Sequence, residues 1–272
     1  MNSDSLSGLT VLITRPSNQQ QVLQQAIEDA GGRVLSLPLI DIAPIVEPAA
    51  LQDLKDKVMQ LDSYSALIFV SNNAVTFGGE AINNYWPQFP VGIDVIAVGP
   101  STAKAAGSAF GCEVIQPSTG MTSEDILELP QLQDVADRKI GIVRGQGGRE
   151  LLAETLRHRG ATVDYLEAYS RKPVMYESAD FCQALRAAGV NILTVTSSES
   201  LDRLTALLID KGLQEDGRAD NREIMQQLSL LTPSQRVAQQ AMEAGYTRVY
   251  NASGADPASF VAALGELGAN QE

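Results

Sequence analysis

Short polar and glycine-rich segments recur where apolar runs end, and their residue types suit the binding of anions. Each follows a run rich in β-branched residues and precedes an amphipathic stretch; they are residues 15–17, 71–73, 99–102, 144–149, 197–199 and 232–234. Backbone amides and hydroxyls at the start of a helix favour negatively charged groups. Capping of a helix explains any single segment, but six of them favour a ligand with several carboxylates or phosphates.

The glycine-rich segment 144–149 does not match the nucleotide-binding motifs. The dinucleotide pattern GxGxxG would need glycine at position 150, where Glu150 stands, and the chain contains no Gly-Lys-Ser or Gly-Lys-Thr. These departures disfavour an NAD or ATP enzyme. We expect Arg149 on the first turn of the following helix, where it either pairs with a carboxylate or is a surface residue.

Tyr169 is the titratable side chain best suited to proton transfer outside the strand ends. It lies in the segment Glu167 to Arg171, where a predicted strand leaves one half of the chain for the other. We expect its phenol to face the cleft between the halves, close to a cation, as an acid or hydrogen-bond donor for a departing hydroxyl. The alternative is that Tyr169 only anchors an amphipathic linker.

The composition excludes several classes of protein. The 272 residues carry a net charge of −13, which argues against a broad nucleic-acid surface. His158 is the one histidine and is expected at the surface, which removes the common histidine metal sites. Cys112 and Cys182 form no CxxC pattern. Neither a signal peptide nor an apolar run of about 20 residues is present, so we expect a cytoplasmic location.

Ten short apolar runs alternate with amphipathic stretches, as in a parallel sheet covered by helices on both faces. The pattern predicts a doubly wound α/β architecture. In the first helix we expect Ser17 as the cap, an apolar stripe that includes Val22, Leu23 and Ile27, and an end at Gly31. The predicted strands are residues 10–14, 33–37, 66–70, 94–98, 113–116, 139–143, 162–166, 191–196, 229–231 and 248–250.

A weak internal repeat relates the two halves of the chain. An offset of 129 residues aligns Ile13 with Ile142 and Gly31 with Gly160, and a second set of matches follows in the same order. Each half would hold about five strands. Two proline-bearing extended stretches, 37–48 and 168–174, are equivalent under this offset and are predicted linkers. Side-by-side domains and domains that exchange elements both fit the repeat. If both linkers cross between the domains, the cleft between those domains is the expected ligand site.

The ordered set of motifs resembles the uroporphyrinogen-III synthase family over nearly the whole chain. The matching residues are Ile13-Thr14-Arg15-Pro16, the runs from Tyr64 to Val75 and from Ala97 to Ala103, Ile142 to Gly145 with Gly148-Arg149, and Glu167 to Arg171. The segment 232–236 departs from the family pattern because it lacks the glycine found before proline in some relatives. We have no functional expectation for the charged segment 214–222.

The resemblance implies a fold of two flavodoxin-like parallel-sheet domains that exchange chain segments and are joined by a two-strand linker. Residues 1–40 with 172–272 would form one domain, and residues 41–171 the other. The implied reaction closes hydroxymethylbilane, an octacarboxylate, into uroporphyrinogen III with inversion of the last pyrrole ring and loss of water, without metal or organic cofactor. We also expect a monomer, a transient contact with hydroxymethylbilane synthase, and no nucleic-acid or membrane partner.

Within this resemblance, Tyr169 is the residue expected to assist departure of the hydroxyl. The residues expected to hold the acetate and propionate groups are Arg15, Ser71, Asn72, Ser101, Thr102, Arg144, Gly145, Arg149, Ser197, Ser198 and Ser234. Backbone amides at helix starts would supply many of these contacts, which reconciles a polyanionic substrate with an acidic protein. Two alternatives stay open: a non-catalytic two-lobed binding protein for a small polyanion, and a family member that has lost catalysis.

Overall fold

The computed structural model describes residues 5–209 and 222–269, so most of the segment 214–222 lies outside the described residues. The chain divides into two compact units: unit 1 contains residues 1–42 and 172–272, and unit 2 contains residues 43–171. Each is described here by itself. That the units are independent domains with the boundaries expected from the sequence stays a prediction.

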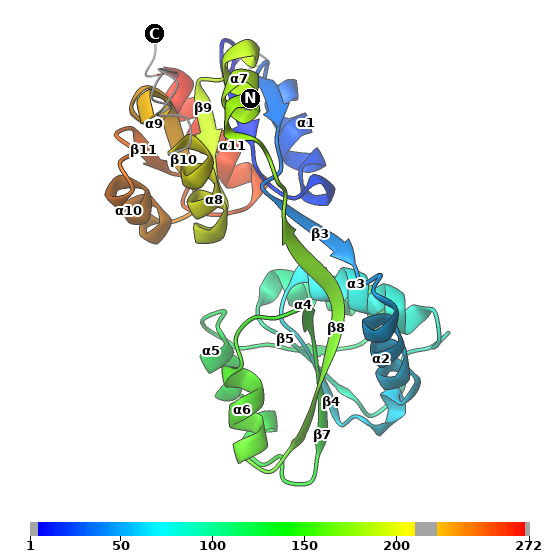
Figure 1. Cartoon of the computed structure of the whole chain (residues 1–272). Coiled ribbons are helices and arrows are strands. Elements are labelled where there is room, and N and C mark those ends of the chain that lie inside the picture. The colour runs from blue at the N-terminus through cyan, green and yellow to red at the C-terminus, as the bar shows by residue number, and fades with distance from the viewer. Residues whose placement is uncertain (1–4, 210–221, 270–272) are drawn as a thin grey trace. The chain divides into compact units, whose positions relative to one another are not determined.

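Unit 1 is built on a five-stranded parallel sheet with the order β11-β10-β9-β1-β2. Helices cover both faces of this sheet (Figure 1). An apolar cluster lies between the sheet and the helices on each face. The strands are β1 (Thr10–Ile13), β2 (Arg33–Ser36), β9 (Ile192–Thr194), β10 (Ser229–Thr232) and β11 (Val249–Asn251). On one face lie α1 (Gln21–Asp29) and α11 (Pro257–Ala269); on the other lie α7 (Ser178–Ala188), α8 (Ser198–Leu208), α9 (Arg222–Gln227) and α10 (Gln235–Glu243).

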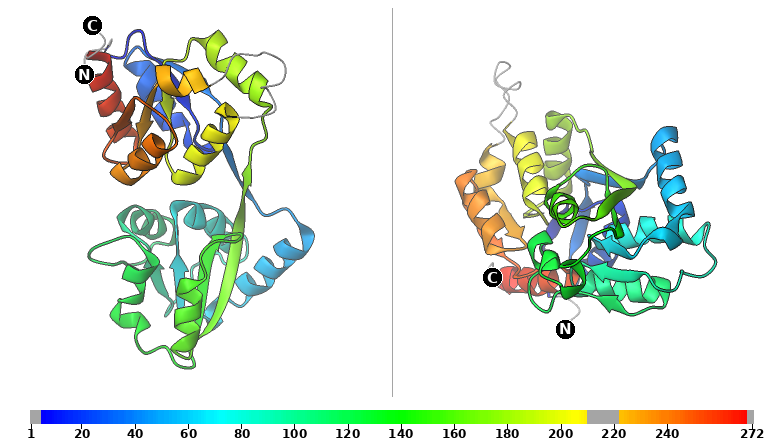
Figure 2. Two further views of the ribbon diagram at one scale, coloured as in Figure 1. Left: turned by 60° about the vertical axis from the view of Figure 1, so that its left-hand side comes forward. Right: turned by 90° about the horizontal axis from the view of Figure 1, so that it is seen from below.

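Unit 2 contains most of a six-stranded sheet with the order β3-β8-β7-β4-β5-β6. The strands are β3 (Ile40–Pro44), β4 (Ala66–Phe69), β5 (Asp94–Ala97), β6 (Val114–Ile115), β7 (Lys139–Gly145) and β8 (Thr162–Pro173). Helices α5 (Ser123–Leu127) and α6 (Leu151–His158) pack on one face. Helices α3 (Asn72–Asn83) and α4 (Pro100–Phe110) pack on the other, with α2 (Pro48–Met59) beside α3. Figure 2 shows helices on both sides of each sheet.

The two sheets have the same topology, which confirms the fold class and explains the internal repeat. Strands β2-β1-β9-β10-β11 and β8-β7-β4-β5-β6 both follow the flavodoxin-like order 2-1-3-4-5. The first repeat supplies β1, β2, β4, β5 and β6, and the second supplies β7 to β11. Each sheet therefore takes its first two strands from one repeat and its other three from the other, which is chain exchange.

The two predicted linker stretches contain β3 and the end of β8, which are neighbours in one sheet (Figure 1). Main-chain hydrogen bonds tie these stretches at two points: Val174 N donates to Leu39 O at 3.1 Å, and Ile45 N donates to Ala168 O at 3.4 Å. The linkers are thus extended and paired with each other.

Three local expectations were wrong. Ser17 makes no capping hydrogen bond, because a 3-10 turn (Ser17–Gln19) precedes α1 and the buried Gln20 amide donates to Arg15 O at 2.6 Å. Val22 is 68% exposed, although Leu23 and Ile27 are buried as predicted. Strands β2 and β11 are partly exposed rather than apolar on both faces, because they are the edges of their sheet.

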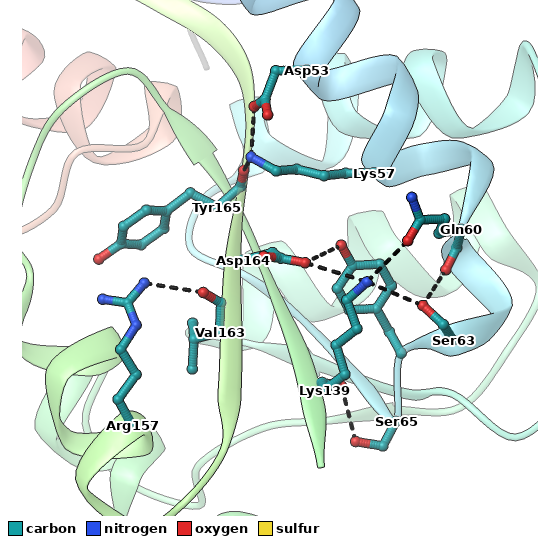
Figure 3. Close-up of polar contacts among 11 residues, drawn as sticks. Asp53, Lys57, Gln60, Ser63, Ser65, Lys139, Arg157, Val163, Asp164 and Tyr165 are labelled. Atoms are coloured by element: carbon teal, nitrogen blue, oxygen red, sulfur yellow. Dashed lines mark hydrogen bonds and ion pairs between the residues drawn. The ribbon is translucent and has the colours of Figure 1, made fainter. Parts of the chain in front are cut away.

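A polar cluster joins the amino-terminal ends of β4, β7 and β8 in unit 2, and Figure 3 shows Lys139 and Asp164 within it. The Tyr64 hydroxyl donates to Asp164 Oδ2 at 2.7 Å, and Lys139 Nζ lies 3.4 Å from the same oxygen and 4.4 Å from the Tyr64 ring centroid. Burial, followed by the bond to Asp164, raises the pKa of Tyr64 above its ordinary value. These three side chains contact one another within unit 2, and we interpret the cluster as structural.

The surroundings of Gly78 in α3 and Gly107 in α4 predict opposite effects of an alanine substitution on stability. A Cβ added at Gly78 would lie 2.4 Å from Val143 Cγ1, whereas one added at Gly107 in α4 would meet only ordinary contacts at 3.6 Å or more. Gly107→Ala should raise the free energy of unfolding by about 0.5–1 kcal/mol, because alanine is the better helix former. Gly78→Ala should lower it by about 1–3 kcal/mol through overpacking. Urea denaturation of both variants measures the difference; a stabilised Gly78→Ala would contradict the described packing.

Candidate functional site

The candidate residues of each unit gather at the carboxyl edge of its sheet, around the point where the strand order reverses. In flavodoxin-like sheets this point lies between the first and third strands and is where ligands bind. In unit 2 it lies between β7 and β4, which lead to Gly145 and Ser71 respectively. In unit 1 it lies between β1 and β9, which lead to Arg15 and Ser197. The topology therefore brings residues far apart in sequence to one edge.

Ser71 and Tyr169 are in direct contact at the edge of unit 2. Ser71 caps α3, its Oγ accepting a hydrogen bond from Ala74 N at 3.1 Å, and the same oxygen lies 3.1 Å from the Tyr169 hydroxyl. The Tyr169 ring packs 5.5 Å from the Phe77 ring and is only 4% exposed. Either of these two hydroxyls can donate the hydrogen bond to the other. That Tyr169 faces a cleft stays a prediction.

Asn72 joins the starts of α3 and α4. Its Nδ2 donates to Ser101 Oγ at 2.7 Å, and its Oδ1 accepts from Thr102 Oγ1 at 3.0 Å. Asn72 and Ser101 are exposed, while Thr102 is buried. Because the Ser101 oxygen is the acceptor, its hydroxyl hydrogen can be donated to a ligand. Asn72 therefore links the starts of the two helices and is also a candidate substrate-binding residue.

Arg144 is turned to the opposite face of β7 from Gly145 and is buried against its own unit. Its guanidinium lies 4.6 Å from the Tyr165 ring centroid and 3.7 Å from Glu150 Oε1, and it donates to the Arg149 carbonyl at 3.2 Å. The sequence did not point to Tyr165, and Glu150 was noted only because it stands where the GxGxxG pattern needs glycine. Their approach to Arg144 depends on the fold of the loop, and no spacing in the sequence indicates it.

Arg149 lies before α6 rather than on its first turn, which corrects the sequence-based expectation. Helix α6 begins at Leu151, because the turn through Gly147 and Gly148 adopts positive φ angles of 72° and 104° and delays the start of the helix. The Arg149 side chain is exposed. Gly145 is buried, and the ring of Tyr169 lies directly over it.

The edge of unit 1 presents two capped helices. Ser197 Oγ accepts from Ser200 N at 3.1 Å at the start of α8, and Ser234 Oγ accepts from Val237 N at 3.4 Å at the start of α10. Ser198 donates to Gln240 Oε1 at 2.6 Å and accepts from Arg236 Nη1 at 2.9 Å. Arg236 is a cation at this edge that sequence reasoning did not select.

Arg15 is 8% exposed and held by its own unit. Its Nη2 donates to Ala255 O at 2.5 Å and its guanidinium lies 5.0 Å from the Phe260 ring centroid, while Nε has no partner among the described residues. Burial lowers the pKa of Arg15, and the charge of Asp256 opposes that shift. A buried cation with one unused donor is suited to a carboxylate that enters from the sheet edge.

Within the described residues, no group of three His, Cys, Asp or Glu side chains is arranged to hold a metal ion. No described helix has the length and apolar character required to cross a membrane. His158 is exposed, as expected, and its Nδ1 lies 2.7 Å from the Glu154 carbonyl oxygen of its own helix.

Comparisons with known proteins agree with this architecture. The family model described as uroporphyrinogen-III synthase HemD matches residues 21–262. A uroporphyrinogen-III synthase of Escherichia coli is 32% identical over 94% of this chain and 100% of its own length, and one of Proteus mirabilis is 36% identical over 72% and 97% respectively. The crystal structure of a mutant uroporphyrinogen III synthase from Thermus thermophilus has a TM-score of 0.62 at 16% identity, covering 97% of this chain and 100% of that one, and so shares the fold. The chain therefore belongs to the uroporphyrinogen-III synthase family.

Proposed function

We propose that the chain converts hydroxymethylbilane to uroporphyrinogen III in tetrapyrrole biosynthesis. Membership of the family supports this activity. The observation that carries it is that two sheets of one topology each present hydroxyls and helix-start amides at the edge where such sheets bind ligands. A substrate with many carboxylates needs many such contacts.

The capping serines supply neutral donors for these carboxylates. In Ser71, Ser197 and Ser234 the hydroxyl oxygen accepts from a helix amide, so the hydroxyl hydrogen is available to a ligand or a neighbouring hydroxyl. The first backbone amides of each helix have no hydrogen-bond partner within the helix, so they too can donate to a carboxylate at the start of that helix. Ser101 and the second amide hydrogen of Asn72 extend the donors of unit 2. The hydroxyl hydrogens of Thr102 and Ser198 are already donated to Asn72 and Gln240, so these two residues are proposed to contact substrate through their backbone amides. This mode of binding does not need a basic protein.

Among the cations, Arg149 is the best placed to meet substrate, because its side chain is exposed. Arg15 offers a buried Nε without a partner, and a carboxylate would satisfy it. Arg144 is already compensated by Glu150, so its direct contact with substrate, like that of Gly145, stays a prediction. We infer that Arg144 acts mainly by fixing the glycine-rich loop.

Tyr169 is proposed to assist the first chemical step. Its hydroxyl, or the Ser71 hydroxyl beside it, donates a proton to the departing hydroxyl as the carbon–oxygen bond breaks, and water leaves. The resulting azafulvene cation is attacked by the substituted carbon of the last ring, which forms a carbon–carbon bond and a spiro intermediate. The bond that joins this carbon to the methylene bridge of the third ring then breaks, and the released methylene carbon bonds to the free α carbon on the other side of the last ring, which inverts that ring. Loss of the proton from that α carbon restores the aromatic pyrrole, completes the macrocycle and balances the proton given to the departing hydroxyl. The protein selects the carbon that attacks by holding the chain in one conformation.

The chain is further proposed to act as a cytoplasmic monomer without metal or organic cofactor. A transient contact with hydroxymethylbilane synthase would suit a substrate that cyclises spontaneously to the uninverted isomer when it is free. The net charge of −13 supports the absence of a nucleic-acid partner.

The product isomer distinguishes the proposed enzyme from its alternatives. Incubation with freshly made hydroxymethylbilane, followed by oxidation and chromatography, should yield the type III porphyrin. A non-catalytic binding protein, or a family member without activity, would leave only isomer I from spontaneous closure. The named relatives are synthases, so the binding-protein alternative is not favoured.

Tyr169→Phe should lower kcat for hydroxymethylbilane by about tenfold or more, because a hydrogen bond to a developing charge contributes about 1.5–3 kcal/mol. Tyr85→Phe, at an exposed position, is the matched control and should keep full turnover. The measurement is the initial rate of isomer III formation. Equal rates for the two variants would reject the acid role of Tyr169.

Ser101→Ala should cost about 1 kcal/mol or less in kcat/KM, because the backbone amides at the start of α4 survive the substitution. The lost contact with Asn72 is replaced by solvent, since both side chains are exposed. The same isomer III assay over a range of substrate concentrations gives the ratio. Loss of activity in a variant that keeps its melting temperature would count against binding by amides.

A further inference from the structure

Strand β8 contains a β-bulge immediately before Tyr169. Along β7 and β8 the paired residues run in step through Val143 with Leu166 and Arg144 with Glu167, but the next pair is Gly145 with Tyr169. Ala168 is therefore the extra residue of the bulge. Bulges bend a strand and change the direction of the side chains that follow.

The bulge transfers the Tyr169 side chain from one face of the sheet to the other. Successive residues of a strand alternate between faces. Tyr165 packs in the cluster formed with α5 and α6, so an unbroken strand would place Tyr169 on that face too. The extra residue instead puts Tyr169 on the face of Val143 and Leu166, where it meets Phe77 of α3 and the capping Ser71. The contact between Tyr169 and Ser71 thus depends on the bulge.

Gly145 provides the space that the redirected ring occupies. A Cβ added there would lie 2.5 Å from Cε2, 2.9 Å from Cζ and 3.0 Å from Cδ2 of Tyr169. The φ angle of Gly145 is not positive, unlike those of Gly147 and Gly148. Glycine is therefore required at 145 for close approach rather than for an unusual backbone conformation. Gln146 N donates to Tyr169 O at 2.8 Å and fixes the tyrosine backbone beside it.

We propose that Gly145 and the bulge at Ala168 form a seat that sets the position of the Tyr169 hydroxyl, so that Gly145 is a positioning residue for the reaction. The inference rests on the proposed acid role of Tyr169 for its effect on turnover, but the seat itself is a property of unit 2. Gly145 acts through its lack of a side chain, and any larger residue displaces the ring from Ser71.

Gly145→Ala tests the seat, and Gly141→Ala is its matched control. Gly141 lies on the same strand and the same face, and an added Cβ there would lie 2.6 Å from Leu67 Cδ2 and 2.9 Å from Leu166 Cδ1. Both variants should have a lower melting temperature because both are overpacked. Only Gly145→Ala should lower kcat, by about tenfold, with KM changed less than twofold, because a small misplacement of a reacting group is costly. Equal kcat values for the two variants would show that Gly145 is merely structural.

A double-mutant cycle with Tyr169→Phe separates the positioning effect from the loss of stability. Phenylalanine keeps the ring and removes the hydroxyl, so Gly145→Ala should lower the melting temperature in both backgrounds but lower kcat only where the hydroxyl is present. Independent, multiplicative losses of kcat would overturn the proposal. If Gly145→Ala does not fold, addition of Tyr169→Ala should restore folding by removing the ring; failure to do so would equally overturn it.

Tyrosine labelled with carbon-13 at Cζ gives a readout that does not depend on activity. The Tyr169 resonance, assigned by its absence from Tyr169→Phe, should move in Gly145→Ala and stay in place in Gly141→Ala. An unmoved resonance in Gly145→Ala would refute the seat whatever the kinetics. A moved resonance together with full turnover in Tyr169→Phe would uphold the seat and reject only the acid role.

Discussion

The parallel direction of the paired strands is the constraint on which the structure depends. Every parallel strand leads into its following loop at the same edge, so serines, amides and arginines that are far apart in the chain become neighbours within their own sheet. In flavodoxin-like sheets, ligands bind at the place on that edge where the strand order reverses. The same arrangement occurs twice, once in each unit, because the two sheets share one topology.

The electrostatic character of the site follows from its use of neutral donors. Arg144 is paired with Glu150, and Arg15 has most of its surface covered by its own unit, so the exposed cations among the residues named at these edges are Arg149 and Arg236. Hydroxyls that cap helices and the amides behind them provide directed partial charges instead. An acidic protein can thereby hold a polyanion, and product selection depends on the geometry of many weak contacts more than on a few strong ones.

Local hydrophobic patterns predicted the doubly wound α/β class, the repeat and the strands other than β3 (Ile40–Pro44), which was expected only as part of an extended linker. The exchange of segments between the domains was implied by the family resemblance. The sequence also placed the capping serines, since Ser71, Ser197 and Ser234 each follow an apolar strand and open a helix. It did not predict that α1 is preceded by a 3-10 turn, that Arg149 lies before α6, or that Arg144 is paired. Those features depend on loop conformation and on contacts between residues distant in the chain. The bulge at Ala168 is likewise invisible in sequence, because one extra residue in a long strand leaves the apolar pattern nearly unchanged.

The exchange of segments between the two sheets has a consequence for synthesis on the ribosome. All the strands of unit 2 except β3 and the last residues of β8 lie between residues 43 and 171, so this unit is complete before β9 has been made. Strands β1 and β2 emerge first but must wait for β9, whose residues Ile192 and Leu193 pair with Val11 and Leu12 about 180 positions earlier. Translation thus makes the strands of unit 2 available for pairing with one another before the sheet of unit 1 can be completed.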